Sequence, residues 1–455
     1  MLNSVSLVLI WWFLLRRVII LGAGGRDLHV FNMYYRHNPE YKVVAVAQVQ
    51  IPGIGGKRYI KGSGELYQPG GLPLIGLKDL EDLGRLIRDL GADEVVLAYS
   101  DLLYNDVGRI ISIVLANGAS FKILGPRDTM IKSSKPMIGV VATRTGAGKS
   151  TVSHEVTLEL VRRGLKVVSI RHPMIYMNPD DMLVQVFRTK EDLMKITFEE
   201  REEYEHYVEI GVPVMAGVDY EMILNEAESM ADVLLWDGGN NDFPFYYTDY
   251  LITVTDARRP GHEVGSFPGE VNTRLADAVI ITKVSDSTPE NVRTIINNVK
   301  AVNPRAKIVQ ADLEVYLDNP NAVSGKRVLI IEDAPTVTHG GLPYGAGYIA
   351  AKKYNAEIVD PRPYAVGIIK ETYAKYTHTG PVLPSLGYTP EQIRDLEETI
   401  RRIPADVVIM GTPAHIEDVV KIDKPIVRAK WRLKVLEGPT VSQLIDEFLE
   451  RVRIK

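Results

Sequence analysis

The stretch GVVATRTGAGKST, residues 139–151, decides the fold. Its small residues allow successive backbone N–H groups to curl around an anion, and a helix that starts there points its positive end at the same anion. The apolar run MIGVVAT leads into the stretch, and the apolar-periodic VSHEVTLELVRRG follows it. This strand, loop and helix order predicts a phosphate-binding P-loop, although Thr143 stands where the pattern G-x-x-x-x-G-K-[ST] has its first glycine.

The loop predicts a site for ATP and Mg²⁺. Lys149 is expected to reach the β and γ phosphates, and the Ser150 hydroxyl to ligate Mg²⁺. Asp237, at the end of the strand-like run ADVLLWD, is expected to hold the same Mg²⁺ through water. The predicted nucleotide-binding residues of the loop are Thr145, Gly146, Ala147, Gly148, Lys149, Ser150 and Thr151.

A second motif, IITKVSD, lies where guanine-specific enzymes carry N-K-x-D. Thr282 replaces the asparagine of that pattern, and Asp286 comes one residue late. Lys283 and Asp286 are still expected on the nucleotide side of the site. Because the guanine motif is incomplete, the sequence favours ATP over GTP.

Short β-branched runs alternate with helical spacing from Arg17 onward, which is typical of a parallel sheet with helices on both faces. We therefore predict an α/β fold with a Rossmann-like N-terminal domain at residues 17–135. A larger P-loop core is expected at 136–325, and a C-terminal α/β part at 326–455 is expected to continue it. A length of 455 residues fits two or three domains.

Composition indicates the class of protein. A chain with 45% hydrophobic residues, 24% charged residues and a net charge of -5 is typical of a globular enzyme, and it offers no basic excess for nucleic acid. The chain has no cysteine, which excludes disulfides and thiolate chemistry and fits a reducing cytoplasm. Helices rich in Arg and Glu, such as RDLEETIRRIP, are compatible with a thermophilic source.

Residues 1–16 form an apolar N-terminal extension. Its apolar run, SVSLVLIWWFLL, has 12 residues and is shorter than the roughly 20 that span a bilayer. Arg16 and Arg17 follow the run, which is the reverse of the charge order in a signal peptide. Three interpretations stay open: an over-long gene start, an added strand or docking helix, and a weak membrane anchor. A membrane location is the least favoured of the three.

Polar clusters follow several predicted strands. In open α/β sheets, ligands bind outside the carboxyl ends of strands, so these loops are expected to converge near the γ-phosphate. Arginine grips phosphates and carboxylates bidentately, which indicates a small anionic, phosphorylated acceptor. The catalytic candidates are Arg144, Lys149, Asp237, Arg171 and His172, and the substrate-binding candidates are Arg258, Arg259, His262, Glu270, Asn272, Thr338 and His339.

Two glycine-rich segments have further interpretations. IEDAPTVTHGGLPYGAG, residues 331–347, is a second anion cradle, a lid or a purely structural turn. LGAGGRDLH, residues 21–29, follows a strand and opens a helix. A dinucleotide site there lacks its ribose-binding acid, because the next strand ends in Gln48 and Gln50. A phosphate or effector pocket that uses Arg26, Asp27 and His29 is the alternative.

Several unusual motifs together resemble the cyclic 2,3-diphosphoglycerate synthetases from about residue 136 to the C-terminus. They are ATRTGAGKS, IRHPM, EEREEYE, GVDYE, WDGGNNDFPF, RPGHE and IEDAPTVTHGGLPYGAG. The resemblance implies an ATP- and Mg²⁺-dependent ligase that phosphorylates 2,3-diphosphoglycerate and closes a phosphoanhydride ring, releasing ADP and phosphate. By that resemblance, Lys149, Ser150 and Asp237 match the nucleotide and metal positions. The N-terminal part departs from methanogen members of the family, which leaves the exact acceptor open.

The rival hypothesis is a regulatory or metallochaperone-like switch that hydrolyses ATP or GTP and acts through a protein partner. Arg144 supports it, because P-loops of the form G-K-G-G-x-G-K-[ST] carry at this position a lysine that reaches the phosphates of a second subunit. Arg144 is therefore expected at the γ-phosphate of its own subunit or of a neighbour in a homodimer.

Overall fold

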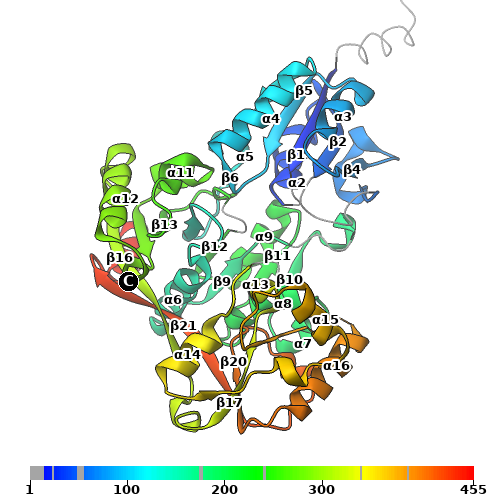
Figure 1. Ribbon diagram of the computed structural model, residues 1–455. Helices are drawn as coiled ribbons and strands as arrows, with labels where there is room; N and C mark the ends of the chain where they lie inside the picture. Colours follow the sequence, from blue (N-terminus) through cyan, green and yellow to red (C-terminus); the bar gives the residue numbers. More distant parts are fainter. Residues whose placement is uncertain are drawn as a thin grey trace, which may run out of the picture. The chain divides into compact units, whose positions relative to one another are not determined.

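The computed structural model describes residues 15–22, 25–48, 56–173, 178–238, 242–338, 341–386 and 389–454. It divides into two compact units, both built from mostly parallel β-sheets (Figure 1). Unit 1 takes in Met1–Phe187, Val212–Asp312 and Val435–Lys455, and unit 2 takes in Arg188–Gly211 and Leu313–Lys434. The predicted α/β class is confirmed. The proposed domain boundaries stay predictions, and residues 1–14 of the N-terminal extension lie outside the described residues.

The first sheet of unit 1 has the strand order β3-β4-β2-β1-β5-β7 and is coloured blue to cyan in Figure 1. All of its pairs are parallel except β3 with β4. The strands are β1 (Arg16–Gly22), β2 (Tyr41–Gln48), β3 (Arg58–Tyr59), β4 (Leu72–Gly76), β5 (Glu94–Ala98) and β7 (Ser120–Lys122). The helices are α2 (Arg26–Val30), which continues as a π-helix over Phe31–Tyr35, α3 (Asp82–Leu90), α4 (Tyr104–Ala116) and α5 (Pro126–Thr129).

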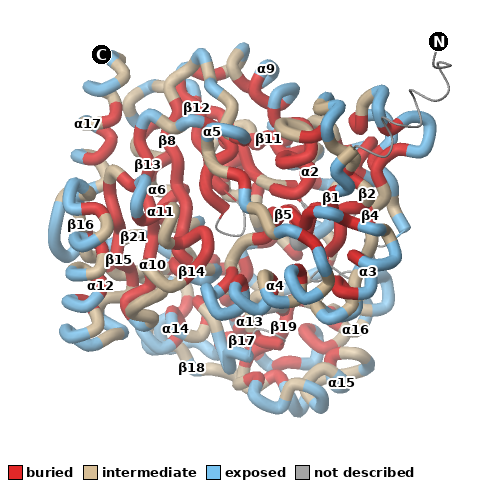
Figure 2. The backbone as a smooth tube through the Cα atoms, turned by 90° about the horizontal axis from the view of Figure 1, so that it is seen from above, coloured by how far each residue is buried: buried red, intermediate tan, exposed pale blue. Residues whose placement is uncertain are grey.

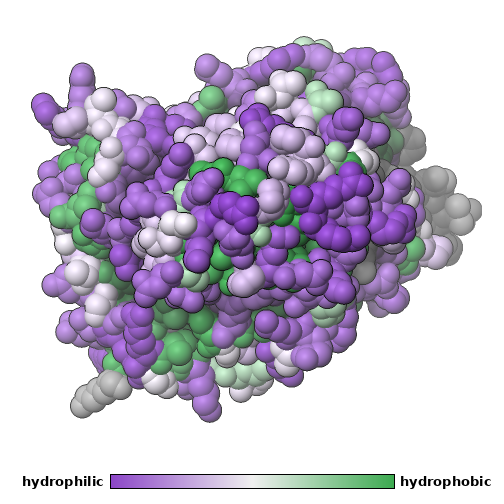
Figure 3. All heavy atoms as spheres, turned by 60° about the horizontal axis from the view of Figure 1, so that its bottom comes forward, coloured by the Kyte–Doolittle hydropathy of each residue, from purple (hydrophilic) through white to green (hydrophobic). Residues whose placement is uncertain are grey.

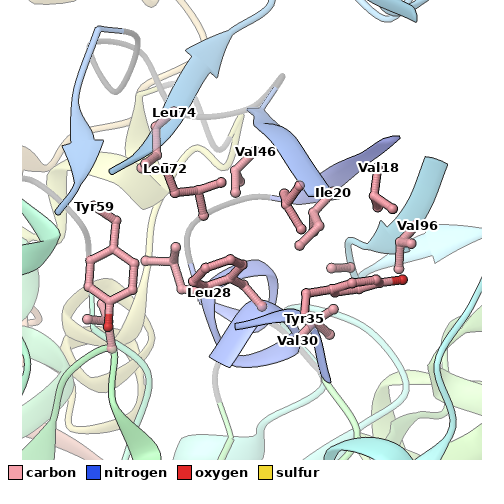
Figure 4. Close-up of a cluster of buried hydrophobic side chains, with 14 of the residues drawn as sticks. Val18, Ile20, Leu28, Val30, Tyr35, Val46, Tyr59, Leu72, Leu74 and Val96 are labelled. Atoms are coloured by element: carbon pink, nitrogen blue, oxygen red, sulfur yellow. The ribbon is translucent and has the colours of Figure 1, made fainter. Parts of the chain in front are cut away.

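Apolar clusters cover both faces of this sheet. Alternate residues of a strand point to opposite faces, so each strand contributes side chains to both clusters. Val18 and Ile20 of β1 join one apolar cluster, and Ile19 and Leu21 join the other. Figure 4 shows the first cluster, in which Leu28 and Tyr35 cover the strands. The continuous apolar run VIIL, residues 18–21, is therefore explained by burial on two sides.

The second sheet of unit 1 carries the P-loop and has the order β10-β11-β9-β12-β8-β13-β15-β16. The strands are β8 (Met137–Ala142), β9 (Val167–Ile170), β10 (Gln185–Phe187), β11 (Val214–Ala216), β12 (Val233–Asp237), β13 (Tyr250–Asp256), β15 (Ala278–Thr282) and β16 (Lys307–Leu317). β10 pairs antiparallel with β11, and the other pairs are parallel. β14 (Ser266–Phe267) and β6 (Leu102–Leu103) form a separate two-stranded antiparallel sheet.

Helices cover the P-loop sheet, whose strands appear buried in Figure 2. They are α6 (Lys149–Arg162), α9 (Tyr220–Met230), α10 (His262–Gly265), α11 (Gly269–Leu275), α12 (Pro289–Val302) and α17 (Val441–Val452). The C-terminal helix α17 lies against α6, where Arg163 pairs with Asp446 at 2.6 Å. The last residues of the chain therefore belong to the P-loop unit.

Unit 2 has the strand order β21-β20-β17-β18, with β19 beside β17. The strands are β17 (Arg327–Glu332), β18 (Glu357–Ile358), β19 (Leu383–Pro384), β20 (Val407–Met410) and β21 (Ile426–Glu437). The helices are α7 (Lys190–Leu193), α8 (Phe198–Val208), α13 (Ala334–Val337), α14 (Ala346–Lys353), α15 (Gly367–Lys375) and α16 (Pro390–Arg402). Residues of β17 alternate between two apolar clusters, so this sheet is also covered on both faces.

The face shown in Figure 3 is largely hydrophilic, with smaller apolar patches between charged side chains. Within the described ranges, no helix has the length and apolar character needed to cross a bilayer.

Candidate functional site

The P-loop lies between β8 and α6 and has the backbone that an anion cradle requires. Gly146 has φ 80° and Gly148 has φ 97°, a left-handed region that strains other residues. Gly148 is also the N-terminal cap of the 14-residue helix α6, and its carbonyl accepts the N–H of Val152 at 3.3 Å. Gly148 is the one glycine kept from the sequence pattern, and Gly146 stands at a variable position of it. Thr143 is not among the residues with a positive φ, which explains why a non-glycine residue is tolerated there.

Side chains from two other loops hold the carbonyl groups of the P-loop. Thr282 donates to the carbonyl of Ala147 at 2.6 Å, Arg259 donates to Thr145 at 2.9 Å, and Lys283 donates to Gly146. In a planar trans peptide the C=O and the N–H of the following residue point in opposite directions. When these side chains hold the loop's carbonyl groups, the N–H groups of the same peptides therefore point away from Thr282, Arg259 and Lys283. Lys283 and Arg259 therefore shape the cradle, whereas Asp286 is exposed.

Asp237 lies at the end of β12 and is fully buried. Lys149 Nζ is 2.5 Å from its Oδ1, Ser153 donates to Oδ1 at 2.8 Å, and Arg171 donates to Oδ2. Burial alone would raise the pKa of Asp237, but Arg171 and Lys149 outweigh it and hold that pKa well below its usual range. The structure thus brings together a charged carboxylate and the P-loop lysine.

These residues fit Mg²⁺ with a nucleotide. Mg²⁺ is usually held by one or two carboxylates together with substrate phosphates, not by an all-protein cage. In keeping with this, the described part of the chain holds no group of three or more His, Asp or Glu side chains arranged around one metal position. Asp237 supplies the carboxylate, and Ser150, exposed in the first turn of α6, is the predicted hydroxyl ligand.

Asp256, at the end of β13, gathers three cations on the other side of the P-loop. Arg258 pairs with it at 2.8 Å, Lys283 at 3.0 Å and Arg259 at 3.4 Å. Burial raises the pKa of Asp256, but the hydrogen bonds from Arg258 and the charge of Lys283 outweigh it and keep the carboxyl ionised. His262 lies nearby, and burial together with Arg259 lowers its pKa. The predicted substrate-binding residues Arg258 and Arg259 therefore lie together beside the P-loop, where both are paired with the carboxylate of Asp256.

Arg144 contacts a carboxylate of the N-terminal sheet. Its Nε lies 2.6 Å from Oδ1 of Asp101, and the same oxygen accepts the N–H of Thr145 at 3.2 Å. Asp101 follows β5 and has φ 62°, a left-handed conformation. The contact links the carboxyl edge of the N-terminal sheet directly to the phosphate loop. The sequence reasoning missed Asp101, although its position just after a buried strand was a usable signal.

A second link between the two sheets involves His172 and Asp242. His172 Nε2 lies 3.2 Å from Asp242 Oδ2, and both side chains are largely buried. Burial and the nearby charge of Arg26 lower the pKa of His172 to about 3, and burial raises the pKa of Asp242 to about 7. His172 is therefore neutral, and the two side chains form a close polar contact rather than an ion pair. A Cβ on Gly25 would lie 3.0 Å from His172 Nδ1, so the backbone at Gly25 packs closely against the His172 ring.

Of the three residues in the predicted effector pocket, two have internal roles. His29 Nε2 bonds the carbonyl of Thr129 at 2.6 Å, and its ring stacks on Phe245 at 4.2 Å. Asp27 accepts the N–H groups of Gly25 and Leu28, and Gln48 donates to it at 2.8 Å. The third residue, Arg26, lies against Phe243 and is treated below.

The structure describes three of the four remaining substrate-binding candidates. Glu270 accepts from Tyr104 at 2.7 Å and pairs with Arg274. Asn272 is buried and donates to the carbonyl of Ala142 at 3.1 Å, beneath the P-loop strand. Thr338 belongs to unit 2, where its hydroxyl bonds the carbonyl of Ala334, and His339 lies outside the described residues. For all four, substrate binding stays a prediction.

The second glycine-rich segment surrounds a carboxylate of the protein itself. Glu332, at the end of β17, accepts N–H groups from Gly345 at 3.0 Å and Tyr348 at 2.8 Å. A Cβ on Gly345 or Gly411 would collide with this carboxylate. Burial raises the pKa of Glu332 to about 7 despite these hydrogen bonds. The anion that this cradle holds in the structure is therefore Glu332.

Two further site residues escaped the sequence reasoning. Ser153 stands four residues after Lys149, so both lie on one face of α6, and that spacing was a signal. Asp242 follows Asp237 by five residues in WDGGNND, but nothing in that stretch distinguishes its carboxylate from a surface one. Its contact with His172 depends on how the strands are ordered.

Comparisons with known proteins show what the chain is similar to. Residues 211–311 match the family model described as cyclic 2,3-diphosphoglycerate synthetase, P-loop domain. The chain is 50% identical over 437 residues to arginine synthetase ArcE of Thermococcus kodakarensis, covering 95% of this chain and 97% of that one. It is 28% identical over 313 residues to a cyclic 2,3-diphosphoglycerate synthetase of Thermococcus gammatolerans, covering 61% and 69%. Among solved structures, LpxK from Aquifex aeolicus in complex with ATP aligns with a TM-score of 0.42 and 12% identity, covering 76% of this chain and 95% of that chain.

Proposed function

The chain belongs to the cyclic 2,3-diphosphoglycerate synthetase family, and on that premise we propose that it uses ATP to activate an oxygen of a small acceptor. Proteins of this family are named synthetases, so the chain is a ligase-type enzyme with a P-loop. The observation that carries the proposal is the pairing of Lys149 with Asp237 beside a glycine cradle. A general anion-binding loop would not need the buried carboxylate.

The protein contributes charge and position rather than a nucleophile. Lys149 exchanges its contact with Asp237 for the phosphates of ATP, while Arg171 keeps Asp237 ionised. Ser150 and Asp237 would hold Mg²⁺, which would supply positive charge to neutralise the phosphates. Arg144 stands at the mouth of the loop, from which its cation stabilises the charge of phosphoryl transfer once Asp101 releases it.

We propose arginine as the product, because the relative at 50% identity is named an arginine synthetase. In such a reaction the γ-phosphoryl group moves to an oxygen on the carbon that becomes the guanidinium carbon, and ADP leaves. A nitrogen nucleophile then attacks that carbon, and the C–O bond breaks with release of phosphate. Both steps take place at one anion-binding site, so the second benefits from proximity.

The second candidate is ring closure of 2,3-diphosphoglycerate, which the family-model match over residues 211–311 favours. Charge argues against it as the first choice. Lys149 and Arg171 share Asp237, Arg144 pairs with Asp101, and the cations around Asp256 are paired as well. A substrate with two phosphates and a carboxylate would have to break several of these pairs, whereas an amino acid would not.

The test uses the reverse reaction, which needs no assumption about the precursor. The protein is incubated with Mg²⁺, ADP, inorganic phosphate and L-arginine, and ATP formation is measured. A parallel reaction supplies ATP and 2,3-diphosphoglycerate and measures ADP. We expect ATP from arginine in the first reaction and none with the Lys149→Met variant. Activity only in the second reaction would establish the other acceptor, and slow hydrolysis insensitive to both would favour the switch hypothesis.

A further inference from the structure

Arg26 is a buried cation at the meeting point of the two sheets of unit 1. It begins α2 and is 4% exposed. Its guanidinium lies 3.4 Å from the centroid of the Phe243 ring, and Nη1 is 3.4 Å from the carbonyl of Phe243. Among the described residues, no carboxylate lies within ion-pair distance of it.

A guanidinium buried without a carboxylate at ion-pair distance is costly, because burial removes its hydration and a more distant charge replaces only part of it. Burial lowers the pKa of Arg26 to about 10, which leaves it charged at neutral pH. The charge of Asp242 acts on it from farther away. Such a side chain is explained by an anion that comes with a ligand.

The neighbours of Arg26 place it on the acceptor side of the site. The charges of Arg26, Arg171 and Lys149 all act on the His172 ring. His172 directly follows Arg171, which bonds Asp237, and it lies next to Gly25, which precedes Arg26. An anion held by Arg26 would therefore lie near the phosphoryl-transfer residues without occupying the P-loop.

We propose that Arg26 binds the carboxylate of the acceptor substrate, an inference that rests on the proposed function. The Phe243 ring covers one face of the guanidinium, so the in-plane N–H groups are the ones that reach a ligand, and their fork matches a carboxylate. The N-terminal sheet then supplies the acceptor site, and the P-loop sheet supplies the ATP site. This division explains why the two carboxyl edges contact each other through Asp101 and Arg144.

The test compares L-arginine with agmatine, which is arginine without its carboxylate. Arg26→Met removes the charge but keeps much of the side chain, and Arg26→Lys keeps the charge but loses the fork. The matched control is Arg127→Met, an exposed arginine in α5 of the same sheet region. Binding of each ligand in the presence of ADP, the affinity for ADP, and the KM and kcat for ATP formation are measured for all four proteins.

We expect the wild type and Arg127→Met to prefer arginine over agmatine. Arg26→Met is expected to raise the Kd and KM for arginine by about 30-fold or more, since it removes a buried charged partner. Affinity for ADP and for agmatine should stay unchanged, and Arg26→Lys should fall between. Circular dichroism and the Tm of the variants establish that the fold is retained.

Two results overturn the inference. The first is an Arg26→Met protein whose acceptor KM stays within about threefold of wild type. The second is an equal loss for arginine and agmatine, which would indicate a general effect on the site. If the wild type acts on 2,3-diphosphoglycerate and not on arginine, the proposed product is wrong, and the same variants are compared on that acid, which also carries a carboxylate. If it acts on neither, both proposals fail.

Discussion

Asp101 of the N-terminal sheet holds Arg144 of the phosphate loop, with 2.6 Å between Oδ1 and Nε. The same oxygen accepts the N–H of Thr145, a group of the P-loop itself. A carboxylate therefore lies beside the phosphate loop, and it engages Arg144, one of the two cations that the sequence predicts at the γ-phosphate. Nucleotide and Asp101 compete for the same groups.

Asp101→Asn should tighten ATP binding by about 3- to 10-fold, because it removes a negative charge beside the phosphates. Asparagine tolerates the left-handed backbone at this position, so the fold should be retained. The Kd for ATP is measured by calorimetry with Mg²⁺ present. Asp128→Asn, an exposed aspartate of α5, is the matched control and should bind ATP as the wild type does. Weaker ATP binding in Asp101→Asn would mean that Asp101 positions Arg144 for the nucleotide.

Lys149→Met should lower turnover by at least about 100-fold, since it removes the cation that meets the transferred phosphoryl group. The fold should survive, because Arg171 and Ser153 still hold Asp237. Steady-state turnover and Tm are compared with Lys300→Met, an exposed lysine of α12. Retained turnover at saturating Mg²⁺ and ATP would refute the assignment of the P-loop as the catalytic site.

His29 should make the protein sensitive to acid. Burial has the largest effect on this histidine, and the charge of Arg26 adds to it. Together they lower the pKa of His29 to about 3, compared with an ordinary pKa of 6.5 in the unfolded chain. Between those values the unfolded state binds a proton that the folded state does not, so stability falls as the pH drops below 6.5. The loss is at most about 1.4 kcal/mol per pH unit.

His29→Gln should therefore lose less stability than the wild type between pH 7 and pH 5, as measured by chemical denaturation. Glutamine can still donate to the carbonyl of Thr129, which limits the loss at neutral pH. The control is His37→Gln, because His37 is exposed and should leave the full pH dependence in place. An identical pH dependence in all three proteins would contradict the explanation.

Gly411→Ala should destabilise unit 2 by about 1–3 kcal/mol, because the added methyl group collides with the carboxylate of Glu332 and forces the cradle to shift. The free energy of unfolding is the measurement. Gly108→Ala serves as the control, since an added Cβ there meets nothing within 4 Å and the position is exposed on α4. Equal stability of the two variants would show that the cradle is loosely packed.

The local chemistry of the loop could be predicted from the sequence. Gly146, Gly148 and Lys149 are recognisable because their order along the chain is itself the structural requirement. Asp237 was also predictable, since a carboxylate that ends a buried run occupies the carboxyl edge of a sheet. The alternation of strands and helices likewise predicted the α/β class, which burial of β1 on both faces bears out.

The pairing of charges could not be predicted in this way. Arg258 and Arg259 are predicted to bind the substrate, and the sequence did not indicate that they also contact Asp256 and the P-loop carbonyl of Thr145. Arg144 is likewise directed to Asp101, 43 positions earlier in the chain. A sequence shows which cations exist but not which carboxylate neutralises each one, because that depends on which strands lie side by side.

The sequence by itself therefore determined the fold class, the phosphate loop and its lysine, because these depend on short-range order and on the burial of periodic apolar residues. Only the tertiary structure decided that Arg26 is buried without a carboxylate at ion-pair distance and that Asp101 contacts Arg144 of the P-loop. It also decided that the carboxylate of Glu332 accepts the N–H groups of the second glycine-rich segment. The physical reason is that desolvation and charge pairing are properties of three-dimensional neighbours. Those neighbours come from strands that are far apart along the chain.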